Sequence, residues 1–267
     1  MNGDLKRVLE EQCRQMGIPL MGIAGVDRWE DTTLAAGIPP EFYPQSIYPD
    51  VRSVIVIGLP VQLPVLETSP SIWYRELYNT VNLLLDQYTY RLSLFLTEQG
   101  FPSVSVPRDG YGGLEALKKN PVTFFSHRHA AYLAGLGTFG INNMLLTSQY
   151  GPRVRFGSIF TEADLPSNPL LNDELCTGCL QCVRCCPAHA LGEGGYPEVL
   201  TDKEACLLYS AELNRQGISP CGICIRVCPV GEDRSRFHRK DPSLYEDPTA
   251  HEAYQRAWKH VRNYGHR

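Results

Sequence analysis

Apolar residues recur every three or four positions in two long segments, and this spacing predicts amphipathic helices. The first segment covers residues 4–16, and Gly17 follows it at the position of a helix C-cap. The second covers residues 73–100, and Gly100 closes its apolar stripe. The stripe consists of Leu77, Val81, Leu84, Leu85, Tyr88, Leu92, Phe95 and Leu96.

Short apolar runs that end in glycine or proline predict strands. Such runs occupy residues 18–26, 53–61 and 101–107. The turn sequence QYGPR indicates that two further strands pair with each other, at residues 143–148 and 154–162. Shorter helices are predicted near 113–119, 127–137 and 252–261. This order of elements predicts an α+β unit that ends near Leu165.

Composition and charge narrow the class of protein. The chain has 267 residues, of which 43% are hydrophobic, so a sizeable core is expected. A net charge of -4 argues against nucleic-acid binding by bulk electrostatics. The sequence has neither a membrane-spanning run nor a secretory signal pattern, so a cytoplasmic protein without membrane contact is expected. In that reducing compartment, ten cysteines suggest metal ligation.

Most of the cysteines form two motifs that are typical of bacterial ferredoxins. One motif is CxxCxxCxxxCP at residues 176–187, and the other is CxxCxxxCP at residues 221–229, with Cys206 upstream of it. In two-cluster ferredoxins the last cysteine of a run binds the other cluster. We therefore predict one [4Fe–4S] cluster on Cys176, Cys179, Cys182 and Cys228. The second is predicted on Cys186, Cys206, Cys221 and Cys224.

Some of these cysteines could instead bind zinc or pack in the core. Paired CxxC sequences also make zinc ribbons, but three-residue repeats that end in Cys-Pro favour iron–sulfur clusters. Cys185 is surplus to both sets and is predicted to pack as a small apolar residue. Cys13 falls on the apolar face of the first helix and is expected in the core.

Three units follow from this pattern. An α+β cofactor and substrate domain is predicted at residues 1–165, and a bacterial ferredoxin-like domain with two clusters at 166–232. A tail with a short helix fills residues 233–267, and residues 165–173 have the composition of a linker. A plain ferredoxin does not need so large an upstream domain, so this domain is expected to use the electrons.

Residues 127–165 resemble the epoxyqueuosine reductase family. The resemblance rests on an Ala-Gly-Leu-Gly turn, a following glycine and asparagine, a strand, and the ferredoxin motif with its offset cysteine. The segments MGIAGVD and SVIVIGLPV are similar as well, so that the resemblance extends over roughly residues 5–232. The matching residues after Ala134 are Gly135, Leu136, Gly137, Gly140 and Asn142.

This resemblance implies a nitroreductase-like domain with a base-off cobalamin beside two [4Fe–4S] clusters, as in reductive dehalogenases. The matching residues would bind the cofactor, because backbone without side chains can approach a flat macrocycle. Chemistry would run through Co(I), with a low-potential donor such as a ferredoxin or flavodoxin. No Asp-x-His-x-x-Gly corrinoid motif is present, so a lower-ligand histidine of that kind is not expected.

Two departures from the family argue against tRNA as the substrate. The family's proton-donating acid lies about fourteen residues before the glycine turn, and that position is Pro121 here. The family has a C-terminal helical-repeat extension, and we expect this protein to lack it, since only about 35 residues follow the cysteine motifs. A small-molecule substrate or a partner corrinoid protein is expected instead.

Replacement proton donors are Tyr78, His127, His129 and Asp109. The two histidines would face one side if their segment is extended, and either could donate a proton. Alternatively, one caps the next helix and the other is solvated. Tyr78 could protonate a carbanion-like product, as reductive dehalogenases are thought to do, or it is a half-buried structural tyrosine. Asp109 is otherwise a turn residue.

Basic side chains suggest two further contacts. Arg153 and Arg155 alternate along a predicted strand and would share one face, where they could bind cobalamin carboxamides or its phosphate. They could equally be ordinary surface arginines. The basic run at residues 234–240 could dock an acidic electron donor or a nucleic acid, or form a solvated linker face.

The sequence therefore favours a cobalamin-dependent iron–sulfur reductase. A first alternative is an electron-transfer protein that reduces the corrinoid of a partner. A second alternative is epoxyqueuosine reduction on tRNA.

Overall fold

The computed structural model describes residues 2–31, 33–34, 37–108, 114–120, 123–247, 249 and 251–264. The strands are β1 (Leu20–Gly25), β2 (Ser53–Pro60), β3 (Ser103–Val106), β4 (Thr138–Phe139), β5 (Leu145–Leu146) and β6 (Val154–Thr161). The helices before the glycine turn are α1 (Asn2–Gln15), α2 (Asp27–Glu30), the 3₁₀ helix η1 (Pro40–Phe42), α3 (Pro44–Ile47), α4 (Leu63–Leu66), α5 (Ile72–Glu98), α6 (Leu114–Lys119) and α7 (His127–Leu133). The helices after it are α8 (Gln181–Arg184), α9 (Lys203–Arg215), α10 (Ile223–Arg226), α11 (Asp233–Arg236), α12 (Ser243–Glu246) and α13 (Glu252–Asn263).

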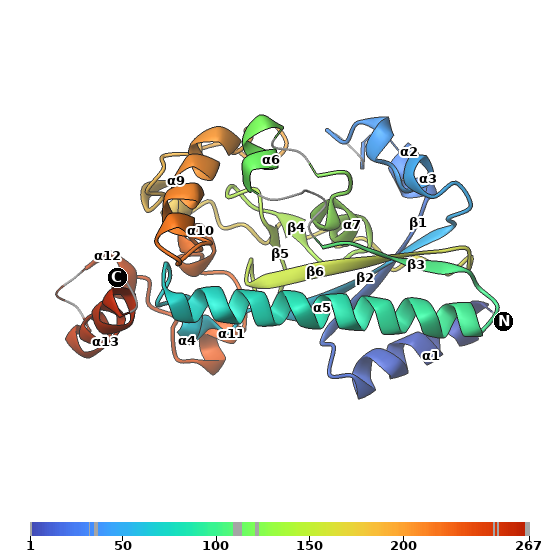
Figure 1. Cartoon of the computed structure of the whole chain (residues 1–267), viewed down its shortest axis with the longest axis horizontal. Helices are drawn as coiled ribbons and strands as arrows, with labels where there is room; N and C mark the ends of the chain where they lie inside the picture. Colours follow the sequence, from blue (N-terminus) through green and yellow to red (C-terminus); the bar gives the residue numbers. More distant parts are fainter. Residues whose placement is uncertain are drawn as a thin grey trace.

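An antiparallel sheet in the order β1-β2-β6-β3 forms the centre of the molecule. Side chains alternate across β2, so Val54 and Val56 join the core that contains α7, while Ile55 and Ile57 join the core beneath α1 and α5. Both faces are therefore buried, which explains why β2 is a continuous apolar run. Figure 1 shows α5 along one face of the sheet and α7 on the other.

The structure confirms the long helix that the apolar stripe predicts, and this helix is α5. The hydroxyl of Ser71 caps its start by accepting a hydrogen bond from the Tyr74 N–H, and Gly100 follows its end with a φ of +88°. Its buried residues include Val81, Leu85 and Leu92. The helix approaches β6 at Gly157, where an added Cβ would lie 2.9 Å from Thr89.

The predicted pairing of residues 143–148 with 154–162 is wrong. β5 pairs with β4, and the connection to β6 keeps only a single bridge between Thr147 and Gly151. β2 pairs with β6 along all of Val154–Thr161, and β3 pairs with Ser158–Thr161 on the other edge. These partners leave β5 only the first half of one edge of β6, and the short strand β5 pairs with β4 instead.

Part of the predicted linker lies along the outer edge of β1. The Ile23 N–H donates to the side-chain oxygen of Asn168, and the Asn168 N–H donates back to the Ile23 carbonyl. The Gly25 N–H donates to the hydroxyl of Ser167. These bonds satisfy an edge that would otherwise be open to another chain.

Arg153 joins the sheet to the cysteine-rich segment. Its side chain is 0% exposed, and its Nε and Nη2 each lie 2.7 Å from a carboxylate oxygen of Asp233. The remaining N–H groups donate to the carbonyls of Ile225, Cys228 and Val230. Since protein acceptors take all five N–H groups, Arg153 acts as an internal brace and has no donor left for a cofactor.

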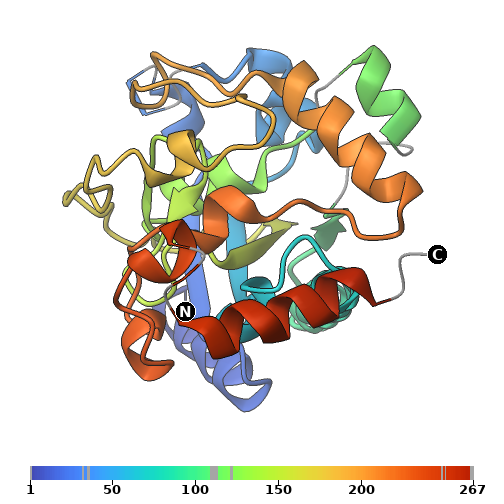
Figure 2. The same cartoon turned by 90° about the vertical axis from the view of Figure 1, so that its left-hand side faces the viewer.

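The basic run at residues 234–240 is not a uniformly solvated face. Arg234 is buried, and Arg239 pairs with the buried carboxylate of Glu67 at 3.1 Å. Further along, Trp258 of α13 stacks on Tyr245 of α12. Figure 2 shows α13 crossing the end of α5, where Arg262 donates to backbone carbonyls just after α4. The tail is therefore packed against the first unit.

Within the described residues, none of the helices has both the length and the apolar composition that a membrane crossing requires.

The substitution Asp233→Ala tests the brace. It leaves the Arg153 charge buried without its carboxylate, so we expect the free energy of unfolding to fall by about 3–5 kcal/mol. Denaturant unfolding under anaerobic conditions measures this loss. The matched control is Glu232→Ala, because Glu232 makes only an exposed contact with Arg236 at 3.7 Å, and we expect it to cost less than about 1 kcal/mol. Equal losses in the two variants would contradict the brace.

Candidate metal and cofactor site

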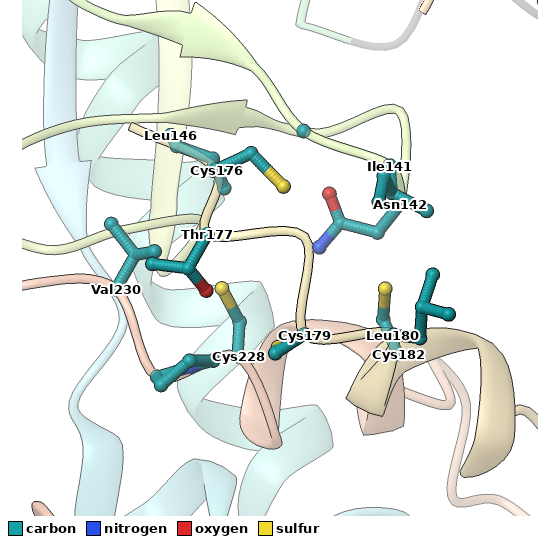
Figure 3. A pocket seen from close by; sticks show the side chains of 12 residues that line it. Ile141, Asn142, Leu146, Cys176, Thr177, Cys179, Leu180, Cys182, Cys228 and Val230 are labelled. Carbon is teal, nitrogen blue, oxygen red and sulfur yellow. The ribbon is translucent and has the colours of Figure 1, made fainter. Parts of the chain in front are cut away.

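The first predicted set of thiols surrounds one cavity. Cys182 lies in α8, Cys176 and Cys179 lie in the loop before it, and Cys228 follows α10. All four line one cavity. Figure 3 shows the sulfur atoms of Cys176, Cys182 and Cys228 around this hollow, with the Asn142 amide at its rim.

Local turns place three of these thiols together. Gly178 and Leu180 both adopt left-handed backbone conformations, with φ values of +67° and +58°. These positions let the chain wind tightly between Cys176 and α8. The fourth thiol, on Cys228, comes from a distant part of the chain, and Arg153 and Arg234 both donate hydrogen bonds to its carbonyl.

The thiols of the first set also interact electrostatically. Burial, and after it the charges of Cys228, Cys179 and Cys176, raises the pKa of Cys182 to about 11. These neighbours are the other three members of the predicted set. The structure therefore brings together the four residues that the motif spacing assigns to one cluster.

The second predicted set forms a similar group. Cys206 lies in the first turn of α9, and Cys224 lies in α10. Burial, with smaller contributions from the charges of Cys206 and Cys186, raises the pKa of Cys221 to about 11. Burial also raises the pKa of Cys224, which interacts with the other three members and with Cys182 of the first set. The two groups of thiols therefore adjoin each other.

Cys185 lies outside both groups. Burial raises its pKa, and the charges that act on it are those of Arg226, Glu246 and Arg184. No other cysteine contributes. Cys13 is buried beneath the sheet in the core of α1 and α5, as the sequence predicts.

The donor set fits iron–sulfur clusters. A buried thiol with a raised pKa stays protonated unless a nearby cation stabilises its thiolate, and bound iron supplies that positive charge. Among the described residues, no three His, Cys, Asp or Glu side chains converge on a point that could hold a single metal ion. The four thiols of the first set line one cavity, an arrangement that suits the ligands of a multi-iron cluster.

The glycine turn mainly allows the protein backbone to approach itself. A Cβ added to Gly135, where φ is +72°, would lie 2.0 Å from the Pro169 carbonyl oxygen. A Cβ added to Gly137 would lie 1.9 Å from the Leu146 carbonyl oxygen. At these two positions the closest atoms thus belong to the protein, whereas the sequence suggested a macrocycle.

The remaining residues of this turn occupy different surroundings. Half-buried Leu136 packs against the core near α7. Gly140 and Asn142 line the cavity of the first thiol set. The Asn142 side-chain amide donates to the Cys224 carbonyl at 3.4 Å, so that this residue links the cavity to the second set.

The two candidate histidines do not share a face. Their segment is helical, because the Ser126 hydroxyl caps α7. His127 hydrogen bonds with Ser158 at 2.8 Å and with the Pro107 carbonyl at 3.1 Å. His129 hydrogen bonds with Ser126 and with the hydroxyl of Tyr196. Neither histidine caps the helix, so both the extended arrangement and the histidine cap are wrong.

Burial lowers the pKa of His129 to about 4, and the charges of Arg128 and Lys203 act in the same direction. The ring is therefore neutral near pH 7. A neutral imidazole whose two nitrogens already have partners is a poor proton donor.

Tyr78 and Arg155 lie together next to the second thiol set. The Arg155 guanidinium lies 4.6 Å above the Tyr78 ring, and its Nε donates to Asn82 at 3.0 Å. Tyr78 makes an edge contact with fully buried Tyr74. Burial raises the pKa of Tyr74, and Tyr78, Arg155, Cys224 and Cys221 also act on it. This pairing of α5 with β6 is a long-range contact that the sequence did not indicate.

Two residues of this region escaped sequence reasoning. Asn82 is buried although it is polar, and its place on the buried face of α5 is the signal that could have found it. Arg128 lies between the two candidate histidines. Its side chain is exposed, yet desolvation lowers its pKa and Arg155, Tyr196, Cys224 and Cys206 all act on it. The Arg128 Nη1 donates to the Asn143 carbonyl at 2.6 Å.

Two sequence expectations lie outside the described residues. They are the alternative acid Asp109 and the proline at the position of the family's acid, Pro121.

Comparison with known sequences gives relatives of two kinds, although no family model matches the chain. The tetrachloroethene reductive dehalogenase of Dehalobacter restrictus is 28% identical over 193 residues, which cover 66% of this chain and 32% of that protein. The match thus spans about a third of the dehalogenase. An epoxyqueuosine reductase of Synechococcus sp. is 27% identical over 274 residues, which cover 90% of this chain and 79% of that protein.

Solved structures of both kinds share the fold. A reductive dehalogenase studied for B12-dependent dehalogenation aligns with a TM-score of 0.65 and 18% identity, over 98% of this chain and 37% of that one. A selenomethionine-labelled epoxyqueuosine reductase aligns with a TM-score of 0.54 and 17% identity, over 90% of this chain and 70% of that one. These matches confirm the resemblance in the sequence and identify the chain as a homologue of the epoxyqueuosine reductases and the reductive dehalogenases, which are oxidoreductases.

Proposed function

We propose that the protein is a cobalamin-dependent iron–sulfur reductase in which two [4Fe–4S] clusters pass electrons to a corrinoid. The observation that carries this proposal is the cavity lined by Cys176, Cys179, Cys182 and Cys228. In this proposal the ferredoxin-like domain is residues 166–232, and residues 1–165 hold the cofactor and substrate. The electrostatic interaction between Cys224 of the second set and Cys182 of the first supports clusters near enough to exchange electrons.

Cobalamin would supply a strong nucleophile and reductant when reduced to Co(I). Among the residues of this chain, Arg128 and Arg155 would bind the polar periphery of the corrinoid, together with the Asn82 amide. His127 and His129 are both engaged with protein groups, which suits a base-off cofactor that takes no ligand from these positions. Gly140 and Asn142 would lie on the cluster side of the site.

Tyr78 would be the proton donor. Replacing a carbon–chlorine bond by carbon–hydrogen consumes two electrons and one proton and releases chloride, whereas reducing an epoxide to an alkene consumes two electrons and two protons and releases water. Both reactions therefore need an acid. The guanidinium of Arg155 over the Tyr78 ring would hold this phenol in position for proton transfer.

Electron transfer to the corrinoid of a partner protein remains the first alternative. Epoxyqueuosine reduction on tRNA is the second, and it is favoured by the match to 79% of the Synechococcus epoxyqueuosine reductase. A low-potential donor such as a ferredoxin or flavodoxin would feed the clusters in every case.

Cobalamin binding tests the main proposal. Anaerobic purification with added cobalamin should yield about one bound corrinoid per chain, visible in the absorption spectrum after gel filtration. Iron analysis of the same sample confirms that the clusters are present. A cluster-loaded protein without corrinoid would exclude the reductase and favour the electron-transfer alternative.

Cysteine substitutions test the cluster ligands. Wild-type protein should contain about eight iron atoms per chain, and Cys228→Ser should lower this to about four by removing one ligand of the first cluster. Cys185→Ser is the matched control because Cys185 lies outside both sets, and its iron content should equal that of the wild type. Iron and sulfide analysis distinguishes these outcomes, and equal loss in both variants would contradict the assignment.

Tyr78→Phe tests the proton donor. Turnover with a chemical low-potential reductant should fall about 100-fold or more, because the general acid is lost while the ring remains. The substrates to assay are tetrachloroethene and epoxyqueuosine-containing tRNA, and the one that reacts assigns the substrate class. Tyr90→Phe is the control, since Tyr90 is exposed on the same helix. Unchanged turnover with Tyr78→Phe would remove Tyr78 from the mechanism.

A further inference from the structure

A buried cation lies directly behind the first thiol set. Arg234 of α11 is 3% exposed, and its Nε donates to the carbonyl of Cys228 at 2.6 Å. Its Nη1 donates to the Arg239 carbonyl and to the Tyr245 hydroxyl, and its Nη2 donates to the Arg226 carbonyl. All of these acceptors are neutral.

No carboxylate neutralises this guanidinium in the part of the chain that the structure describes. The neighbouring carboxylate of Asp233 forms its ion pair with Arg153. The carboxylate of Glu67 is bound by Arg239 and by the Tyr245 hydroxyl, so it lies one residue further away. Burying a charge without a counter-ion is costly, so an anion close to Arg234 would offset that cost.

The anion that the cavity can provide is the cluster itself. A [4Fe–4S] cluster with four thiolate ligands carries net negative charge, and this charge grows by one when the cluster accepts an electron. A fixed positive charge nearby therefore favours the reduced form. Arg153 contacts the same Cys228 carbonyl, but Asp233 neutralises it, so Arg234 supplies the uncompensated charge.

We propose that the buried positive charge of Arg234 raises the reduction potential of the cluster that Cys228 ligates. This inference rests on the proposed function, because it requires that cluster to be bound. It assigns a role to part of the basic run that sequence reasoning placed in a docking surface or a solvated linker.

The test is a redox titration of the cluster-loaded protein under anaerobic conditions, followed by electron paramagnetic resonance. Arg234→Gln should shift one of the two midpoint potentials to a more negative value and move the other much less. Arg234→Lys keeps the charge and should retain most of the wild-type potential. Arg236→Gln is the matched control, because it removes the same charge from an exposed position two residues away on α11, where solvent screens it.

A second uncharged variant keeps the proposal testable if Arg234→Gln does not hold its clusters. Arg234→Met fills much of the same space without a charge and should shift the same midpoint to a more negative value. Two bound clusters with unchanged midpoints in these variants would overturn the inference and leave the proposed function standing. Wild-type protein that binds no cluster would instead refute the proposed function.

Discussion

The buried guanidinium of Arg153 is the interaction on which the site depends. Arg153 directly precedes the inner strand β6 and binds the Asp233 carboxylate. It also donates to the carbonyls of Ile225, Cys228 and Val230. The glycines around it leave no room for side chains, since a Cβ at Gly151 would lie 2.1 Å from the Val230 carbonyl oxygen. A rigid sheet thereby fixes the position of a thiol that local turns cannot place. The four thiols can then face one cavity.

The cost of burying thiolates explains why this bracing is needed. Without metal, burial holds the pKa of Cys182 and Cys221 near 11, so the folded protein favours protonated thiols. Binding iron must displace those protons, and a preformed arrangement lowers the entropy cost of doing so. The same low-dielectric surroundings strengthen the effect of every fixed charge near the cavity. This is why buried Arg234 matters more than the exposed arginine beside it on α11.

Tertiary packing distinguishes the candidate proton donors from one another. His127 and His129 stand out in the sequence, but the cap at Ser126 makes their segment helical and gives each ring its own protein partners. Tyr78 lies on α5 but outside its apolar stripe. It becomes the best candidate because β6 brings Arg155 over its ring. Such a contact joins positions far apart in the chain, and periodicity within one helix cannot reveal it.

The sequence by itself determined the features that arise from short-range spacing. These are the periodic helices and the apolar strands. The partition of the cysteines into two cluster ligand sets stays a prediction, and the thiols that act on Cys182 are those of its own predicted set. Only the tertiary structure decided what each isolated polar residue does. It made Arg153 a brace, placed protein carbonyls against Gly135 and Gly137, and paired β5 with β4. Local spacing constrains residues within a turn or two, whereas contacts between distant segments depend on how the whole core packs.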